Sequence, residues 1–445
     1  MTKQNFGLVG NAKEQLVKRF LARRDSHSDS GLTASVGLRA ANNLAQIPEK
    51  FCRFDKFPGY EKVVLPQVAA RKLGIENPYF KTHDGVADAT TMIGGKPYIN
   101  FSSYNYLGLS GDARVNRAAK DAIDRYGTSA SASRLVAGER PIQRDLEEAI
   151  AGLYEVDDCV VFVSGHATNV TTIATLFGPK DLIVHDSLIH NSVFEGIKLS
   201  GATRRAFKHN DPESLEGILA EIRGNFERTL IVIEGLYSMD GDIPDLPRFI
   251  DIKQRFRAFL MVDEAHSIGV LGNTGRGIRE HFGVAGSAVD IWMGTLSKSF
   301  AGCGGYIAGE NALVEHLKYG ASGFVFSVGI APAMAGASLE AIRIMLAEPE
   351  RLALLRERAG YFLKQARACG IDTGFSHGCA VIPAIVGSSL KATKLSQHLF
   401  EQGVNVQPII HPAVEEKAAR LRFFVSLMHT QAQIDRVAAL LEKAI

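Results

Sequence analysis

The sequence predicts an α/β protein built around a mainly parallel sheet. From Ser110 onward, short apolar runs alternate with segments of helical periodicity, and this alternation is typical of parallel strands joined by crossover helices. Helical stretches include Pro141 to Leu153 and Asp211 to Ile222. The apolar runs between the helical stretches are bounded by turn or polar residues, as buried parallel strands usually are: Cys159 to Val163, Leu182 to Val184, Thr229 to Ile233, Phe259 to Val262 and Ile291 to Met293.

The remainder of the chain is organised differently. Short strands are expected around Lys81 to Phe101, with a turn at Gly94-Gly95. After Pro332 the sequence becomes helix-rich and then strand-like at Ala380 to Val386 and Leu421 to Leu427. These changes predict an N-terminal extension, a segment with short strands, a large domain and a smaller α+β C-terminal domain, over residues 1–60, 61–110, 111–332 and 333–445 respectively.

The N-terminal extension is expected to form a basic arm. Asn11 could cap a short helix from Ala12 to Arg24, and a Ser- and Gly-rich linker follows over Asp25 to Ser35. The helix either packs on the body or docks on an acidic partner or a membrane surface.

Composition narrows the class of protein. Lys plus Arg is 50 and Asp plus Glu is 48, so no strong field favours nucleic acid as a partner. The 5 cysteines form no CxxC pair, which argues against zinc and dithiol redox motifs and for a reducing compartment. With no apolar leader region and no long apolar run, the sequence predicts a cytoplasmic enzyme, with peripheral membrane association left open through the basic arm.

The first chemical motif is Val262-Asp263-Glu264-Ala265-His266, at the end of an apolar run. Ligands of open α/β sheets bind outside the carboxyl ends of strands. There, Asp263 could hold a protonated ring nitrogen and His266 could hydrogen-bond a neighbouring oxygen. Alone, Asp263 could equally be a helix cap or an ion-pair partner. A nucleotide helicase would also need a GxxxxGK[ST] phosphate loop, which the sequence lacks.

The second motif is Gly294-Thr295-Leu296-Ser297-Lys298-Ser299, followed by several glycines. A lysine among small residues at a strand end suits a Schiff base, which requires an unprotonated amine close to an aldehyde. Thr295 and Ser297 offer hydroxyls to a phosphate. A lone lysine is more often a solvated surface residue, but the upstream Asp263 favours the chemical interpretation.

Taken in order, these motifs resemble the α-oxoamine synthases, a branch of the fold-type-I pyridoxal-phosphate enzymes that includes serine palmitoyltransferase, aminolevulinate synthase and aminooxononanoate synthase. The resemblance extends from Tyr98 to the C-terminus and leaves residues 1–60 uncovered. Besides the two motifs above, it rests on Asn105-Tyr106-Leu107-Gly108-Leu109, Ser133-Arg134 with Gly138, Ser164-Gly165-His166-Ala167-Thr168-Asn169, His190-Asn191-Ser192, Glu234-Gly235-Leu236-Tyr237-Ser238-Met239-Asp240-Gly241-Asp242, and Arg420-Leu421-Arg422 with His429-Thr430.

The resemblance implies a cofactor site for pyridoxal 5'-phosphate. Lys298 would form the Schiff base, and Asp263 would pair with the ring nitrogen. His190 would lie on the cofactor face; otherwise it is a core histidine with satisfied hydrogen bonds. His266 and Ser238 would bind the ring oxygen. No metal is implied.

Phosphate binding is implied at two further places. Backbone N–H groups at Gly165 and His166 would cradle the phosphate, although His166 stands where the family has an aromatic residue. Ser327 matches a residue that reaches the phosphate from the neighbouring subunit, which implies a homodimer with shared active sites. The next residue, Val328, replaces a hydroxyl residue common in relatives.

The implied reaction joins a small L-amino acid to an acyl thioester with loss of carbon dioxide, giving an α-amino ketone. Arg422 would hold the amino-acid carboxylate, unless it forms only a salt bridge on its strand; Arg420 is the more structural of the pair. Tyr104 and Asn105 would bind substrate. Tyr104-Asn105-Tyr106 resembles serine palmitoyltransferases and favours serine, with alanine and glycine left open.

The resemblance implies acyl-CoA or an acyl carrier protein as the acyl donor. The run Gly127 to Arg134 resembles synthases encoded with polyketide or fatty-acid machinery, which favours a carrier protein. Two alternatives remain: a fold-type-I aminotransferase, which releases no carbon dioxide, and a non-catalytic partner subunit, which the presence of Lys298, Asp263 and His190 argues against.

Overall fold

The computed structural model describes residues 47–72 and 74–444. The chain forms two compact units, residues 1–69 and 70–445. The predicted helix from Ala12 to Arg24 and the linker after it lie outside the described residues. In the first unit, the 3-10 turns Glu49–Phe51 and Phe54–Lys56 precede α2 (Pro58–Lys72), which ends in the second unit.

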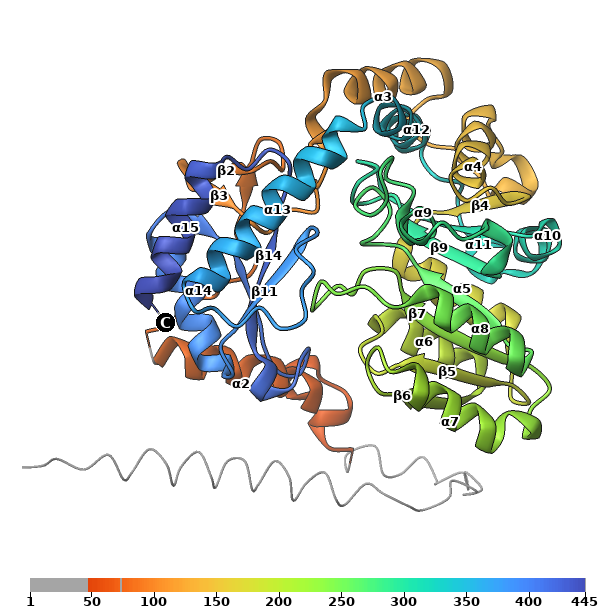
Figure 1. Cartoon of the computed structure of the whole chain (residues 1–445), viewed down its shortest axis with the longest axis horizontal. Helices are drawn as coiled ribbons and strands as arrows, with labels where there is room; N and C mark the ends of the chain where they lie inside the picture. Colours follow the sequence, from red (N-terminus) through yellow and green to blue (C-terminus); the bar gives the residue numbers. More distant parts are fainter. Residues whose placement is uncertain (1–46, 73, 445) are drawn as a thin grey trace, which may run out of the picture. The chain divides into compact units, whose positions relative to one another are not determined.

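The second unit contains a seven-stranded sheet with strand order β4-β10-β9-β8-β7-β5-β6 (Figure 1). All neighbouring strands are parallel except β10, which runs antiparallel to both β4 and β9. The α/β fold with a mainly parallel sheet is therefore confirmed. The strands are β4 (Asp158–Phe162), β5 (Leu182–Asp186), β6 (Thr203–Phe207), β7 (Thr229–Glu234), β8 (Phe259–Asp263), β9 (Ile291–Thr295) and β10 (Gly305–Gly309).

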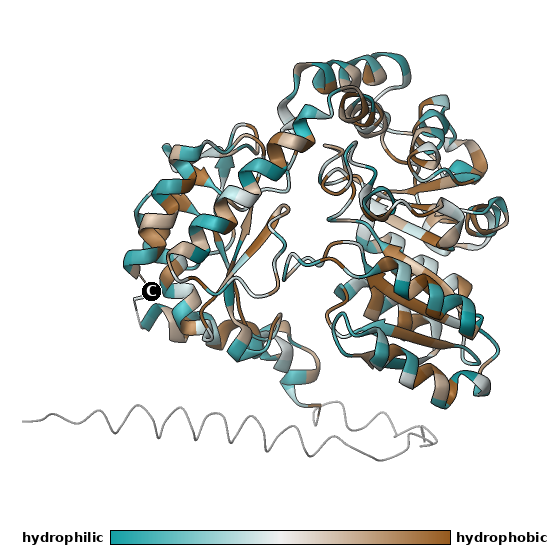
Figure 2. Ribbon diagram, in the orientation of Figure 1, coloured by the Kyte–Doolittle hydropathy of each residue, from teal (hydrophilic) through white to brown (hydrophobic). Residues whose placement is uncertain are grey.

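Side chains along the central strands alternate between two buried layers. In β7, Leu230 and Val232 pack in a cluster with Ile173 of α5, whereas Ile231 packs in a second cluster with Leu215 of α7. Because helices cover both faces of the sheet, the central strands are mainly apolar, as Figure 2 shows. The helices of this region are α3 (Ala113–Tyr126), α4 (Pro141–Tyr154), α5 (Gly165–Leu176), α6 (Asn191–Ser200), α7 (Pro212–Ile222), α8 (Leu246–Phe256), α9 (Gly277–Phe282), α10 (Asn311–Gly320), α11 (Ser322–Val325) and α12 (Pro332–Ala347).

Of the helices predicted by residue range, the two in the described part of the chain form close to those ranges, and local chemistry explains where they begin. Pro212 occupies the first turn of α7, and the Asp211 carboxylate accepts the Ser214 N–H at 2.8 Å. Pro141 likewise occupies the first turn of α4.

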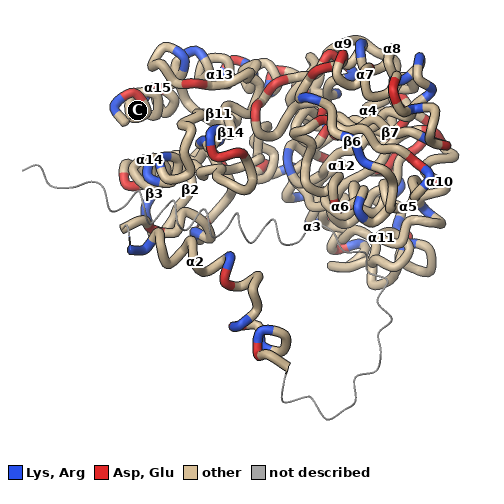
Figure 3. Tube along the Cα trace, turned by 90° about the horizontal axis from the view of Figure 1, so that it is seen from below, with Lys and Arg blue, Asp and Glu red and all other residues tan. Residues whose placement is uncertain are grey.

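The edge strand β6 has a different composition. Arg204 and Arg205 are exposed on it, and Figure 3 shows basic residues along this edge. Charged side chains on an edge strand disfavour pairing with another chain.

Two smaller sheets complete the second unit. One has strand order β1-β2-β3-β12, and its turn at Gly94 and Gly95, with φ 57° and 76°, confirms the predicted hairpin. The other has order β11-β14-β13. The elements are β1 (His83–Asp84), β2 (Thr90–Ile93), β3 (Lys96–Asn100), β11 (Val381–Ile385), β12 (Val404–Asn405), β13 (Gln407–Ile409), β14 (Arg420–Phe424), α13 (Glu350–Ala368), α14 (Ser389–Glu401) and α15 (Gln431–Ala444).

A separate core unites the C-terminal elements with β3, whose Ile99 packs with Phe362 of α13 and Phe423 of β14. The parallel pairing of β12 with β3 makes the same link between distant parts of the sequence. No helix within residues 47–72 and 74–444 is both long and apolar enough to cross a membrane.

Candidate active site

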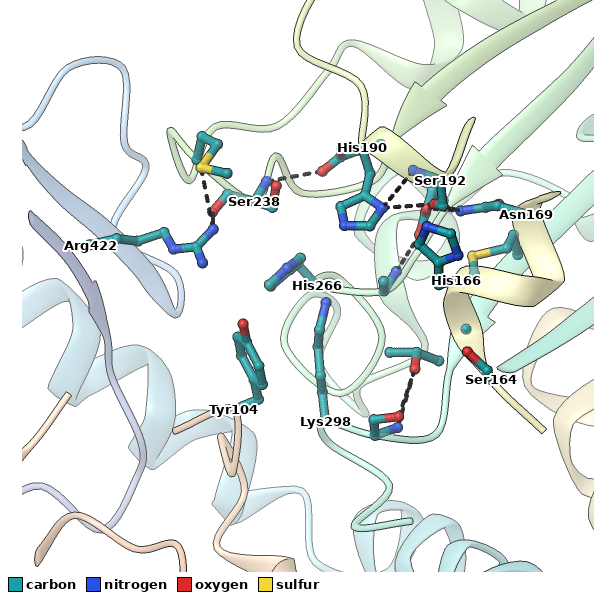
Figure 4. A pocket seen from close by; sticks show the side chains of 18 residues that line it. Tyr104, Ser164, His166, Asn169, His190, Ser192, Ser238, His266, Lys298 and Arg422 are labelled. Carbon is teal, nitrogen blue, oxygen red and sulfur yellow. Dashed lines mark hydrogen bonds between the residues drawn. The ribbon is translucent and has the colours of Figure 1, made fainter. Parts of the chain in front are cut away.

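A cavity of about 320 Å³ opens at the carboxyl ends of the central strands. Its walls come from the ends of β7, β8 and β9, the N-termini of α5 and α6, and β14 (Figure 4). The lining residues are Tyr104, Ser164, Gly165, His166, Asn169, His190, Ser192, Glu234, Ser238, Met239, Asp263, Ala265, His266, Met293, Thr295, Ser297, Lys298 and Arg422. Nearly all the residues predicted for the site are therefore brought together here.

Lys298 follows β9 and extends into the cavity (Figure 4). Burial lowers the pKa of its ammonium group to about 7, and the negative fields of Asp263 and Glu234 only partly oppose that effect. Its Nζ lies 5.4 Å from the centre of the Tyr104 ring. A lysine with this pKa is substantially unprotonated near neutral pH, so it can act as a nucleophile or a base.

Asp263 is the last residue of β8, and two donors fix its carboxylate. The Asn169 amide donates to Oδ2 at 2.9 Å, and the Ala265 N–H donates to Oδ1 at 3.0 Å. The same Asn169 amide also donates to Ser192 Oγ. Asn169 thereby links the acidic group to the segment that carries His190.

Three histidines line the cavity, His166, His190 and His266, and burial favours the neutral form of His190 and His266. Ser192 donates to His190 Nδ1 from its hydroxyl at 2.7 Å and its N–H at 3.3 Å, and burial lowers the pKa of His190. His266 Nδ1 lies 2.8 Å from the Tyr106 hydroxyl. Burial, followed by the fields of Lys298 and Arg422, lowers the pKa of His266 well below its usual value.

The N-terminus of α5 forms part of the cavity wall. A Cβ at Gly165 would come within 2.9 Å of Thr295 Oγ1, so glycine allows α5 to approach the end of β9. The N–H groups of the first helical turn carry positive partial charge toward the cavity. Thr295 Oγ1 donates to the Gly304 carbonyl at 2.9 Å, so its proton is already engaged. Ser297 also lines the cavity.

The two arginines of β14 have different partners. Arg420 donates to Asp240 Oδ1 at 2.6 Å and to the Met239 carbonyl at 3.0 Å, and both side chains are buried. Arg422 Nη1 donates to the Ser238 carbonyl at 3.0 Å, and its Nε has no hydrogen-bond partner within the described part of the chain. Arg422 therefore retains donors for an anionic ligand, whereas Arg420 anchors the loop that carries Ser238.

Two predicted residues lie outside this cavity. The Asn105 amide donates to the Ala87 carbonyl at 2.9 Å and accepts the Ser110 N–H at 3.0 Å, so it shapes its own turn and lines a neighbouring cavity. Ser327 lies beyond α11, next to Val328.

Sequence reasoning assigned no role to seven residues that line the cavity: Ser164, Asn169, Ser192, Glu234, Met239, Ala265 and Met293. Glu234 carried the same signal as Asp263, an acidic residue at the end of a buried strand. Asn169 and Ser192 act through contacts that only the fold reveals.

The loop that carries Ser238 is also anchored from the large sheet. His209 bridges Asp186 Oδ1 and Asp242 Oδ2, each at 2.9 Å, and Tyr237 donates to Asp186 at 2.9 Å. Burial alone lowers the pKa of His209, but the hydrogen bonds to the two carboxylates outweigh it and raise the pKa to about 10.

Replacement of His209 by glutamine should therefore destabilise the protein in a pH-dependent way. Because the pKa of His209 is raised from 6.5 to about 10 on folding, its stabilisation is complete below pH 6.5 and is lost as the pH rises through about 10. We expect a loss of about 3 kcal/mol at the acidic end of this range. Urea unfolding of both proteins at several pH values measures the difference, and a pH-independent difference would contradict the assignment.

Comparison with known proteins identifies similar chains. The family model described as "Aminotransferase class I and II" matches residues 96–441. An 8-amino-7-oxononanoate synthase from Fervidobacterium nodosum is 40% identical over 358 residues, covering 80% of this chain and 90% of that protein.

Solved structures are similar over a comparable length. Sphingomonas wittichii serine palmitoyltransferase is 29% identical with a TM-score of 0.83, covering 87% of this chain and 97% of that one. A structure of SPT with a PLP internal aldimine is 27% identical with a TM-score of 0.83, covering 88% and 98% of the two chains.

Proposed function

The chain belongs to the α-oxoamine synthases, a family of pyridoxal-phosphate-dependent acyltransferases, and from that premise we propose that it joins L-serine to a carrier-bound acyl thioester. Enzymes of this family release carbon dioxide and a thiol and form an α-amino ketone. The observation that carries the proposal is the convergence of Lys298, Asp263 and the partly unpaired Arg422 on one cavity.

The cavity fits pyridoxal phosphate. Gly165 and His166 of the first turn of α5 line the cavity, where their N–H groups would hold the phosphate, and Ser297 lines the same cavity. Asp263 would hold the ring nitrogen and Lys298 would bond to the aldehyde carbon. The bound cofactor supplies an electron sink for the negative charge that forms at the substrate α-carbon.

The side chains of the cavity then have distinct tasks. Arg422 would bind the substrate carboxylate through its free donors. The neutral amine of Lys298 would take the α-proton and later return it. Neutral His190 would orient the amino acid, and His266 with Ser238 would hydrogen-bond the ring oxygen.

Tyr104 supports serine as the amino acid. Its phenolic oxygen points into the open space bounded by Arg422, His266 and Lys298 (Figure 4), where it can hydrogen-bond a substrate hydroxyl. The names of the relatives point in two directions. Serine palmitoyltransferase names serine, whereas 8-amino-7-oxononanoate has a methyl group beside its amino-bearing carbon, as an alanine-derived product would. Alanine is therefore the main competitor.

The experiment that tests the function uses the full chain loaded with pyridoxal phosphate. L-serine, L-alanine and glycine are each supplied with the same acyl group on coenzyme A or on an acyl carrier protein. We expect equal amounts of carbon dioxide and free thiol, fastest with serine and the carrier donor. Amino-group transfer without carbon dioxide would indicate an aminotransferase, and an inert protein without covalently bound cofactor would indicate a non-catalytic subunit.

Alanine substitution of the two β14 arginines should separate binding from folding. Removal of Arg422 takes donors away from the substrate carboxylate, so the KM for the amino acid should rise about 10- to 100-fold. Removal of Arg420 leaves buried Asp240 unpaired and should instead lower stability by about 3 kcal/mol. Steady-state kinetics and urea unfolding of both variants provide the measurement. An unchanged KM for Arg422→Ala would contradict its role.

A homodimer is the assembly that the proposed site requires. Segments 133–138 and 322–329 lie side by side, since Ser133 donates to the Val325 carbonyl at 2.6 Å and the Gly329 N–H donates to the Ala132 carbonyl at 3.1 Å. They expose an apolar patch, which favours contact with a second copy: Leu135, Val136, Phe326 and Val328.

Mixing Lys298→Ala with Ser327→Ala chains should restore activity. If Ser327 serves the partner's site, each mixed dimer has one site with both lesions and one with neither. Half of the dimers are then mixed, so, where Ser327→Ala alone is inactive, activity should approach about one quarter of the wild-type value. Assays before and after subunit exchange measure the gain. A strictly monomeric enzyme with full activity would rule out the shared site.

A further inference from the structure

Glu234 and Asp263 form a pair of carboxyl groups at the base of the cavity. They end the adjacent parallel strands β7 and β8, and they are direct partners in the strand register. Both are 3% exposed, and both line the cavity. Two buried carboxylates at neighbouring positions repel each other strongly, so ionisation of one disfavours ionisation of the other.

Their hydrogen bonds distinguish the two groups. Asp263 receives donors on both oxygens, from Asn169 and Ala265. Glu234 accepts the Ser238 N–H at 3.0 Å on Oε2, while its buried Oε1 has no partner among the described residues. A buried anionic oxygen without a hydrogen-bond donor raises the free energy of the folded state. A protonated carboxyl group avoids this cost because it carries no charge.

We propose that Glu234 is the neutral member of this pair and thereby keeps Asp263 as the ionised one. Glu234 is then a positioning residue: its proton prevents a second negative charge beside Asp263 and Lys298. The inference rests on the proposed roles of Asp263 and Lys298 and adds a group that sets their charge.

The charged groups around Glu234 agree with this assignment. Burial raises the pKa of Glu234 most, followed by Asp263, with a smaller contribution from Asp186 on β5, and together they bring it to about 8. The Ser238 hydrogen bond and Lys298 act in the opposite direction. The negative charge of Asp186 is balanced by its hydrogen bond with His209. Arg422 donates to the Ser238 carbonyl, whereas the Ser238 N–H donates to Glu234.

The proton on Glu234 should therefore titrate within the working range of the enzyme. Above about pH 8, its loss adds a negative charge facing Lys298 and raises the pKa of that lysine. At a given pH, more of Lys298 is then protonated than beside an uncharged group, and less of it can act as a base. The rise of the catalytic rate with pH should therefore extend to a higher pH in the wild type than in a variant with an uncharged residue at position 234.

Carbon-13 NMR of side-chain carboxyls in the full chain, labelled at glutamate and loaded with pyridoxal phosphate, tests the charge state directly. We expect a glutamate resonance with a midpoint near pH 8 that disappears in Glu234→Gln. Glu264→Gln is the matched control: the pKa of Glu264 is also about 8, but its carboxylate is engaged by Ser267 and the Ile278 N–H, away from the cavity lining. It should remove a different resonance.

Two further readouts use the same proteins. The absorbance of the bound cofactor and kcat should both change near pH 8 in the wild type, and Glu234→Gln should abolish these changes while Glu264→Gln preserves them. A Glu234 resonance, assigned by its loss in Glu234→Gln and its retention in Glu264→Gln, that is already ionised at pH 7 in the wild type would overturn the proposal. Because the NMR result does not depend on turnover, failure of the proposed reaction would be recognised separately.

Discussion

Replacement of Lys298 by alanine is expected to abolish turnover, with a loss of about 10,000-fold or more, because the variant lacks both the nucleophile and the base of the site. The side chain lies in the cavity with Asp263 and Arg422, and burial lowers its pKa to about 7. Borohydride reduction of the wild-type protein, followed by peptide mass mapping, should place the cofactor on Lys298. The variant should bind the cofactor without a covalent link.

Lys253 provides the matched control for this experiment. It is also largely buried, with 13% of its side chain exposed, but it pairs with Asp290 at 2.8 Å outside the cavity. Lys253→Ala should lower stability and leave the covalent link intact. A cofactor attached to any lysine other than Lys298 would show that the proposed chemistry is assigned to the wrong residue.

The central strands could be predicted from the sequence because both of their faces are buried. β5, β7, β8 and β9 are continuous apolar runs because helices cover both sides of the sheet. The same criterion finds neither β6, whose exposed edge carries Arg204 and Arg205, nor β10, which begins and ends in glycine. The antiparallel direction of β10 could not be predicted from the sequence either, because strand pairing depends on contacts between distant residues.

The site could be predicted where a reactive side chain ends an apolar run, as Asp263 does, or follows one within a motif of small residues, as Lys298 does. The hydrogen-bonded chain from Asp263 through Asn169 to Ser192 and His190 could not, because it joins three separate elements. The pairing of Glu234 with Asp263 depends likewise on strand register. For Asn105 the motif alone was misleading. The motif predicted a residue that binds substrate, but the Asn105 side chain forms hydrogen bonds with its own turn and with Ala87.

Asp263→Asn should retain the fold and slow removal of the substrate α-proton by about 100- to 1,000-fold. An amide at this position cannot supply the negative charge that favours a protonated ring nitrogen, so the cofactor accepts less charge from the α-carbon. The amide oxygen of the new asparagine can still accept the hydrogen bond from the Ala265 N–H. The rate of α-proton exchange with deuterated solvent, measured with L-serine and no acyl donor, isolates this step from the later ones.

Asp290→Asn is the control that removes the same charge elsewhere on the sheet. Asp290 accepts the Leu260 N–H at 2.7 Å and pairs with Lys253, and it does not line the cavity. This variant should be less stable yet exchange the α-proton at the wild-type rate. Both variants have lost one carboxylate. If only Asp263→Asn loses α-proton exchange, the loss must come from the position of the missing charge and not from the change in total charge. Equal exchange rates in Asp263→Asn and the wild type would exclude Asp263 as the partner of the ring nitrogen, even if the variant were inactive in the complete reaction.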